Sequence, residues 1–177
     1  LLNIYGLYRE NNDVDDEINK QIRIIQPNIL QKNKWKKDLE EVNFSKLIKL
    51  SSINSKNVDM LIWPETSLPF FLEYKKNFQN IILNNISKPI ILGARRYDKN
   101  SNKLYNSAYY LNANGKVEQI YDKKHLVPFG EFVPFNNFLK IFVETGIENN
   151  GITGFSVGTK KNEIIIDNSI KISLFIC

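Results

Sequence analysis

The amino-acid sequence predicts an α/β domain in which strands and helices alternate around a buried sheet. A short β-branched run at residues 22–26 and a continuous apolar run at residues 60–63 are each followed directly by a proline, which is typical of a strand whose exit is set by that residue. Each run is followed by a longer segment with apolar side chains at helical spacing. This order, in a chain of 177 residues of which 42% are hydrophobic, predicts one main core.

The two helices are predicted from their amphipathic pattern. Residues 34–53 place Trp35 and further apolar residues near helical spacing, with Lys and Glu between them. Residues 71–86 repeat the pattern, and Pro89 ends it. Both helices are therefore expected to cover the sheet with one face and to turn a charged face toward solvent.

The second half of the chain is predicted to be mostly strands. Asn114 and Gly115 suit a turn with positive φ, so the strands on either side are expected to form a hairpin. Residues 126–143 are rich in aromatics and prolines and predict a long functional loop. The predicted strands are residues 90–92, 104–111, 116–121, 163–166 and 171–176.

Composition argues against several classes of function. The net charge of +5 and the pI of about 9.1 would permit a polyanionic partner. However, the only arginines are Arg9, Arg23, Arg95 and Arg96, and arginine is the residue that binds phosphates and bases through paired hydrogen bonds. We therefore expect no nucleic-acid partner. One Cys and one His exclude a disulfide framework, a multi-cysteine zinc site and a His-rich metal centre. No other motif in the sequence implies a metal or a cofactor, so none is expected.

Three residues stand at places where a reaction could be carried out. Glu65 follows the buried run 60–63, at the sheet edge where α/β folds place their sites. Lys123 follows a predicted strand, and Cys177 comes directly after an apolar strand. Taken singly, each has an ordinary explanation: a glutamate in the first turn of a helix, a surface lysine and a buried thiol.

Taken together, these residues resemble the nitrilase, or carbon-nitrogen hydrolase, superfamily. The motifs that carry the resemblance are, in chain order, Trp-Pro-Glu at residues 63–65, Tyr-x-Lys-x-His-Leu at 121–126 and the Cys after an apolar strand. Leu-Val-Pro-Phe-Gly-Glu-Phe-Val-Pro at 126–134 looks like the apolipoprotein N-acyltransferase branch of that superfamily. Ile-Gln-Pro-Asn at 25–28 and Tyr-Asn-Ser-Ala at 105–108 also fit this branch.

The resemblance implies a nitrilase-like α-β-β-α sandwich, truncated at its C-terminal side, with a Glu-Lys-Cys triad. Glu65 would be the general base, Lys123 the cation that stabilises the oxyanion and Cys177 the nucleophile. Glu131 matches a second, supporting carboxylate that would orient the lysine. The implied activity is transfer of an acyl chain from a phospholipid, through a cysteine thioester, to the N-terminal amine of a diacylglyceryl-cysteine lipoprotein.

The aromatic loop offers the apolar surface that a lipid-facing lid would need. Phe129, Phe132 and Phe135 are the candidate residues for contact with substrate. The alternative is that they pack on the domain itself.

The resemblance also implies a division of the chain. Residues 1–20 would be the tail of a membrane segment plus a linker, and residues 21–177 the N-terminal part of the catalytic domain. The family has a membrane domain before its catalytic domain and further strands after its cysteine, so membrane association would come through segments outside this sequence. The expected location is the bacterial inner membrane, with the catalytic domain facing the periplasm. The isolated chain is expected to be inactive.

Three alternatives remain open at this point. A soluble carbon-nitrogen hydrolase would use the same triad on an amide or nitrile, with water as the acceptor. A cysteine hydrolase would pair Cys177 with His125, the only histidine. An inactive lipid-surface binding module would catalyse no reaction.

Overall fold

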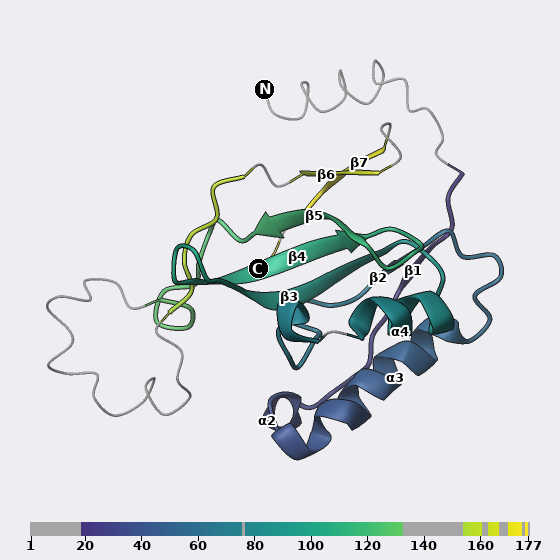
Figure 1. Ribbon diagram of the computed structural model, residues 1–177, viewed down its shortest axis with the longest axis horizontal. Coiled ribbons are helices and arrows are strands. Elements are labelled where there is room, and N and C mark those ends of the chain that lie inside the picture. Colours follow the sequence, from purple (N-terminus) through teal and green to yellow (C-terminus); the bar gives the residue numbers. More distant parts are fainter. Residues whose placement is uncertain are drawn as a thin grey trace, which may run out of the picture.

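The computed structural model shows a five-stranded sheet with helices on one face and a two-stranded hairpin on the other (Figure 1). It describes residues 19–75, 77–132, 154–160, 163–166, 170–174 and 176. Cys177, Phe135 and most of the predicted loop at 126–143 lie outside these described residues. Within the described part of the chain, no helix is long and apolar enough to cross a bilayer.

The central sheet has the strand order β1-β2-β3-β4-β5. The first three strands are parallel, and the remaining pairs are antiparallel. Because parallel strands end at the same edge, the carboxyl ends of β1, β2 and β3 lie together. The strands are β1 (Ile22–Ile24), β2 (Met60–Ile62), β3 (Ile90–Asp98), β4 (Lys103–Leu111) and β5 (Val117–Asp122).

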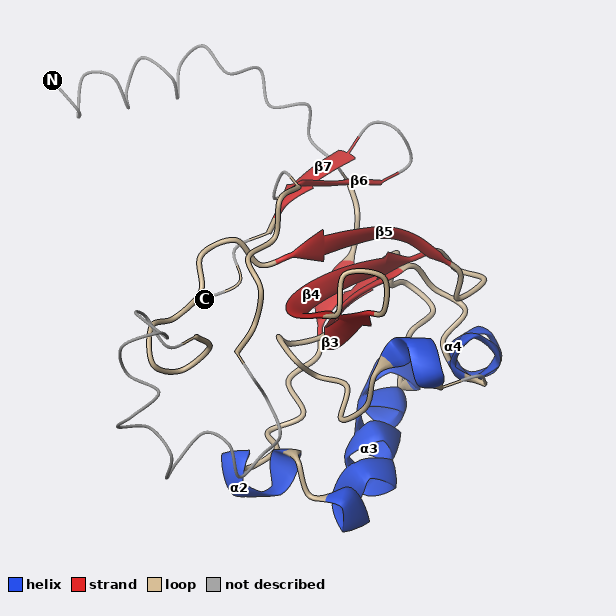
Figure 2. Ribbon diagram, turned by 60° about the vertical axis from the view of Figure 1, so that its left-hand side comes forward, coloured by secondary structure: helices blue, strands red, loops and turns tan. Residues whose placement is uncertain are grey.

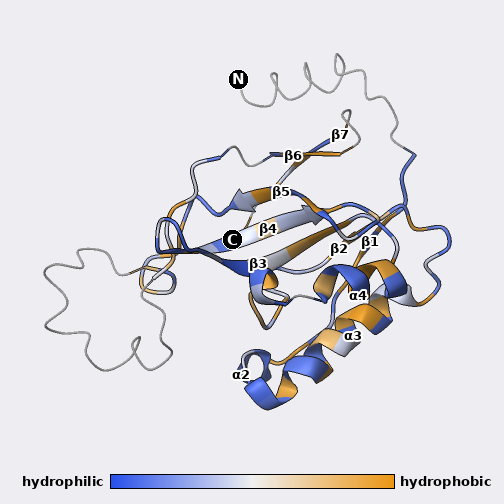
Figure 3. Ribbon diagram, in the orientation of Figure 1, coloured by the Kyte–Doolittle hydropathy of each residue, from blue (hydrophilic) through white to orange (hydrophobic). Residues whose placement is uncertain are grey.

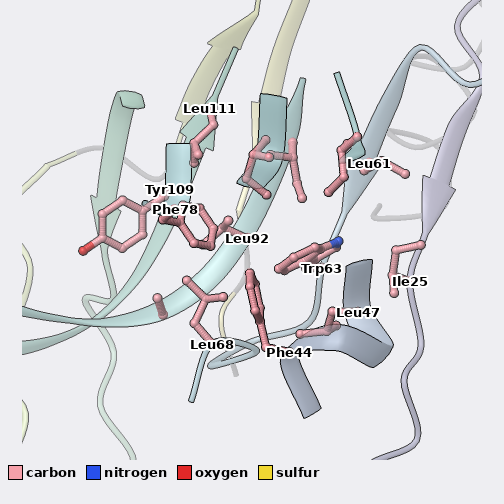
Figure 4. Close-up of a cluster of buried hydrophobic side chains, with 14 of the residues drawn as sticks. Ile25, Phe44, Leu47, Leu61, Trp63, Leu68, Phe78, Leu92, Tyr109 and Leu111 are labelled. Carbon is pink, nitrogen blue, oxygen red and sulfur yellow. The ribbon is translucent and has the colours of Figure 1, made fainter. Parts of the chain in front are cut away.

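Two helices cover one face of this sheet, α3 (Glu40–Ser52) and α4 (Phe78–Asn85) (Figure 2). Trp63, which follows β2, packs against Phe44 and Leu47 of α3 (Figure 4). Its indole Nε1 donates a 2.8 Å hydrogen bond to Ser51 Oγ inside the core. Figure 3 shows hydrophobic and hydrophilic residues alternating along both helices, as the amphipathic pattern predicts.

The opposite face of the sheet is covered by a hairpin of β6 (Glu163–Ile166) and β7 (Ile170–Ser173). Burial alternates along β6, where Ile164 and Ile166 are buried. They belong to a second apolar cluster with residues of the central sheet, including Met60 and Ile91. Helices, sheet and hairpin thus form three layers of an α/β sandwich, which confirms the predicted fold class.

Two predicted helices and several predicted strands differ from the structure. The strand predicted at 22–26 ends at Ile24, and the strand predicted at 171–176 is β7, which ends at Ser173, so residues 174 and 176 before Cys177 are not in a strand. In place of one helix over residues 34–53, the structure has α2 (Gln31–Lys34), the short 3-10 helix η1 (Lys37–Leu39) and α3. Trp35 lies between α2 and η1, outside the helices, and its ring contacts Arg95. Residues 71–86 form the 3-10 helix η2 (Leu72–Tyr74) and α4. Strand β3 continues past the apolar residues to Asp98, since it pairs with β4 along its whole length. The hairpin predicted around Asn114 and Gly115 is confirmed.

Candidate active site

Glu65 is held at the carboxyl end of β2 by a tightly anchored turn. Trp63, two residues earlier, is buried, and its backbone N donates to Ile91 O at 2.8 Å. After Glu65, the backbone N of Ser67 donates to Gly93 O, also at 2.8 Å. Thr66 between them has φ of 45°, a region that a β-branched residue rarely enters. The surrounding packing and hydrogen bonds therefore fix the backbone of Glu65.

Gly93 of β3 makes this turn possible. A Cβ built on Gly93 would lie 2.6 Å from Glu65 Cα and 2.5 Å from Thr66 N, both backbone atoms. No other residue type leaves room for the turn at this distance, because backbone atoms cannot move aside as a flexible side chain can.

Lys123 directly follows β5 and is fixed on both sides by its backbone. Its N donates to Asn106 O at 2.8 Å, and Gly158 N donates to Lys123 O at 2.9 Å. Gly158 comes so close that a Cβ there would lie 2.0 Å from Asp122 O. The Lys123 side chain is only 1% exposed. The ordinary explanation of Lys123 taken singly, a lysine on the protein surface, is therefore wrong.

The buried ammonium of Lys123 lies between two carboxylates. Its Nζ is 2.9 Å from Glu131 Oε2 and 3.7 Å from Glu65 Oε1. The nearer carboxylate is the more buried one: the Glu131 side chain is 13% exposed and that of Glu65 is 37% exposed. A buried charge is tolerated only when it is paired and hydrogen-bonded, and these carboxylates provide that pairing.

Asn106 of β4 joins the two carboxylates and was not predicted as a site residue. Its Nδ2 donates to Glu65 Oε1 at 2.5 Å and to Glu131 Oε1 at 2.9 Å. Asn106 is almost fully buried. The sequence contained one usable signal: Asn106 lies in the Tyr-Asn-Ser-Ala motif at 105–108, where polar residues interrupt an apolar and aromatic stretch, and a buried polar side chain requires partners.

A compact turn at the start of the aromatic loop positions Glu131. The backbone N of Val127 donates to Glu131 Oε2 at 2.9 Å, and Glu131 N donates to Val127 O at 2.8 Å. Burial raises the pKa of Glu131, but hydrogen bonds from Lys123, Val127 and Asn106 outweigh this and hold its pKa below that of an ordinary glutamate. Glu131 is therefore an anion engaged on both of its oxygens.

The remaining predicted site residues are placed as follows. Phe129 is 67% exposed, whereas Phe132 is half-buried. His125 is exposed. Cys177 and Phe135 lie outside the described residues, so their roles stay predictions. In the described part of the chain, no group of three or more His, Cys, Asp and Glu side chains could hold a metal ion.

The fold and the site together define a class of protein. It is a three-layer α/β domain with a buried lysine between two glutamates at one edge of the sheet. The sequence model of the carbon-nitrogen hydrolase family matches residues 21–177. The chain belongs to this family, which is a family of enzymes.

The curated proteins that resemble the chain have a more specific name than that of the family. The chain is 31% identical over 175 residues to the apolipoprotein N-acyltransferase of Brucella suis, covering 93% of this chain and 32% of that protein. It is 32% identical over 176 residues to the apolipoprotein N-acyltransferase of Rhodopseudomonas palustris, covering 90% of this chain and 32% of that protein. The chain therefore spans about a third of the length of these relatives.

A solved structure of glutamine-dependent NAD+ synthetase from Acinetobacter baumannii also resembles the chain. The TM-score is 0.48 and the sequence identity 18%, over 77% of this chain and 24% of that one.

Proposed function

We propose that this protein is the catalytic part of an apolipoprotein N-acyltransferase that forms an acyl thioester on Cys177. The single observation that carries the proposal is the buried Lys123 ammonium between Glu65 and Glu131. The similarity to apolipoprotein N-acyltransferases over about nine-tenths of the chain supports the choice of reaction.

Glu65 suits the general base better than Glu131 does. Glu131 is engaged on both oxygens, by Lys123, Val127 and Asn106. Glu65 is more exposed, and the described residues engage only its Oε1. Its second oxygen is therefore available to accept a proton from a thiol.

The first half-reaction then proceeds as follows. Glu65 accepts the thiol proton of Cys177, and the thiolate attacks the ester carbonyl carbon of a phospholipid. Lys123 stabilises the oxyanion of the tetrahedral intermediate, for which its charge is held in place by Glu131. The C–O bond to glycerol breaks, Glu65 returns the proton to the leaving oxygen, and a lysophospholipid departs from the thioester.

In the second half-reaction Glu65 again acts as the base, and Cys177 becomes the leaving group. Glu65 accepts a proton from the N-terminal amine of a diacylglyceryl-cysteine lipoprotein as the amine attacks the thioester carbonyl. Collapse of the intermediate forms the amide and returns the Cys177 thiol. Release of the first product before the second substrate binds gives ping-pong kinetics.

The proposal includes the arrangement at a membrane. Residues 21–177 would be the N-terminal part of a catalytic domain that faces the periplasm beside the inner membrane, with residues 1–20 leading in from a membrane segment. The family match, which begins at residue 21, supports the boundary between these two parts. The exposed ring of Phe129 supports a lipid-facing role for the loop that also contains Phe132 and Phe135.

A second candidate is a carbon-nitrogen hydrolase that uses the same groups with water as acceptor. The family match favours it as much as it favours the transferase, because the description of the family covers hydrolysis of carbon-nitrogen bonds. The two candidates differ in the acceptor and also in the acyl donor, which is a phospholipid ester for the transferase and an amide or nitrile for the hydrolase. The donor is the difference that the experiment tests.

The experiment is intact-mass analysis of the full-length protein after incubation with phospholipid. We expect a hydroxylamine-labile acyl adduct on Cys177 in the wild type and none in Glu65→Gln. Glu118→Gln, which changes an exposed glutamate of β5, is the matched control and should keep the adduct. Turnover of an amide or nitrile without any adduct from phospholipid would identify the hydrolase instead. Absence of both reactions would leave only a lipid-surface binding function.

A further inference from the structure

Arg95 of β3 is a half-buried cation without a described anionic partner. Its guanidinium carbon lies 4.4 Å from the ring centroid of Trp35 and 5.0 Å from that of Phe71. Its Nε is buried and has no hydrogen-bond partner among the described residues. No described carboxylate forms an ion pair with Arg95, whereas its neighbour Arg96 binds both oxygens of Asp122 at 2.8 and 2.9 Å.

The position of Arg95 in the sheet places it beside the candidate active site. Arg95 lies directly opposite Asn106 in the antiparallel pairing of β3 and β4. Side chains opposite one another in such a pair share a face of the sheet and start about 5 Å apart. Gly93, two residues earlier on β3, contacts the backbone of Glu65.

A second cation borders the same place. Lys34 Nζ donates to Glu65 O at 3.2 Å and to Thr66 Oγ1 at 2.7 Å. It also lies 5.4 Å from the ring centroid of Trp35. Trp35 therefore contacts both cations, and Lys34 contacts the turn that carries Glu65.

Among the described residues no carboxylate pairs with Arg95, and its buried Nε donates no hydrogen bond, so this guanidinium could bind an anionic ligand. Burial lowers the pKa of Arg95, and it lowers the pKa of Lys34 more than Glu65 raises it. An anion bound here would offset this cost. Trp35 is 43% exposed, so the stack opens to solvent and a ligand can reach it. A planar guanidinium that contacts two rings presents its remaining N–H groups in a restricted range of directions, which suits two oxygens of one phosphate.

We propose that Arg95, which contacts the rings of Trp35 and Phe71, forms with Lys34 a binding subsite for the phosphodiester group of the acyl donor. This inference rests on the proposed function. In a phospholipid only the glycerol backbone separates the phosphate from the ester to be cleaved. A phosphate on Arg95 and Lys34 would therefore leave the ester near Glu65 and Lys123.

The test compares two acyl donors in the full-length protein: a phospholipid in detergent micelles and a p-nitrophenyl ester of the same fatty acid, which has no phosphate. The measured quantity is the second-order rate constant of acyl-adduct formation. Loss of a charge-assisted pair of hydrogen bonds corresponds to roughly a 10- to 100-fold effect. We expect Arg95→Gln to lower the phospholipid rate by that factor and the nitrophenyl ester rate by less than about threefold.

Two further variants separate phosphate binding from structural damage. Arg95→Lys keeps the charge but not the paired donors, so its phospholipid rate should fall between those of wild type and Arg95→Gln. Lys99→Gln is the matched control, because Lys99 also lies over an aromatic ring, that of Tyr74, and is exposed. It should leave both rates unchanged.

Competition assays identify the source of the phosphate. Soluble glycerophosphoethanolamine should inhibit the nitrophenyl ester reaction of the wild type and not that of Arg95→Gln. Inhibition by inorganic phosphate at equal or lower concentration would overturn the lipid assignment. Equal loss of both rates in Arg95→Gln, or no loss of either, would overturn the subsite while the wild type still forms its adduct. A wild type that forms no adduct with phospholipid would overturn the proposed function, and the subsite with it.

Discussion

Asn106 Nδ2 lies 2.5 Å from Glu65 Oε1, so an amide from β4 orients a carboxylate that belongs to the end of β2. The same nitrogen also donates to Glu131. One neutral side chain thus holds both carboxylates that surround the buried Lys123. The site depends on this pairing because two carboxylates close together repel each other unless donors and a cation lie between them.

Asn106→Asp tests this relationship with little change in volume. The new carboxylate removes the donor and adds a third negative charge next to Glu65 and Glu131, so Glu65 should be displaced. We expect acyl-adduct formation to fall by roughly 10- to 100-fold, as for loss of a charge-assisted hydrogen bond. Asn112→Asp is the control, since Asn112 also donates to a glutamate, Glu118, but in an exposed turn. Equal rates for wild type and Asn106→Asp would refute a positioning role for Asn106.

Gly93→Ala should displace Glu65 through the backbone. The added Cβ would meet backbone atoms of Glu65 and Thr66 at 2.6 Å or less. We expect a loss of about 1–3 kcal/mol in the free energy of unfolding, measured by urea denaturation, together with a lower rate of adduct formation. Gly130→Ala is the control, because its Cβ would meet only ordinary contacts with Val127 at 3.5 Å or more. If Gly93→Ala proves as stable and active as Gly130→Ala, the close packing described here is wrong.

Lys123→Met and His125→Ala distinguish the lysine-based site from a cysteine-histidine pair. Lys123 is buried between two carboxylates, whereas His125 is exposed. Removing one preorganised oxyanion donor typically lowers a rate by about 100- to 1,000-fold, and we expect that loss in Lys123→Met. His125→Ala should retain the adduct. Thermal unfolding checks that Lys123→Met still folds, and the reverse pattern of rates would favour the pair of His125 with Cys177.

The lowered pKa of Glu131 predicts that the stability of the folded protein falls at acidic pH. Its pKa is lower in the folded protein than in an ordinary glutamate. Its stabilising effect is therefore complete above about pH 4.3, the unperturbed value, and is lost as the pH falls through the lower folded pKa. We expect Glu131→Gln to be less stable than wild type by about 2 kcal/mol at neutral pH, and the difference to shrink below about pH 4. A difference that stays constant down to pH 2 would contradict this assignment.

Local sequence pattern was sufficient to locate the strands, though not all of their ends, and to single out Glu65, Lys123 and Glu131. The apolar runs closed by proline became β1 and β2, and the turn at Asn114 and Gly115 became the predicted hairpin. Glu65 and Lys123 were identified because they follow strands and match motifs that are contiguous in the chain. Each of these features depends on residues that are neighbours in the sequence.

Contacts between distant segments were decided only by the tertiary structure. Asn106 reaches Glu65 because β4 pairs with β3 in one register, and Gly93 is required because β2 and β3 are adjacent. Trp35, which was predicted to be helical, lies outside the helices and contacts Arg95, which is far along the chain on β3. The physical reason is that strand pairing and close backbone approach depend on which residues face each other after folding. The amino-acid pattern within one segment does not contain that information.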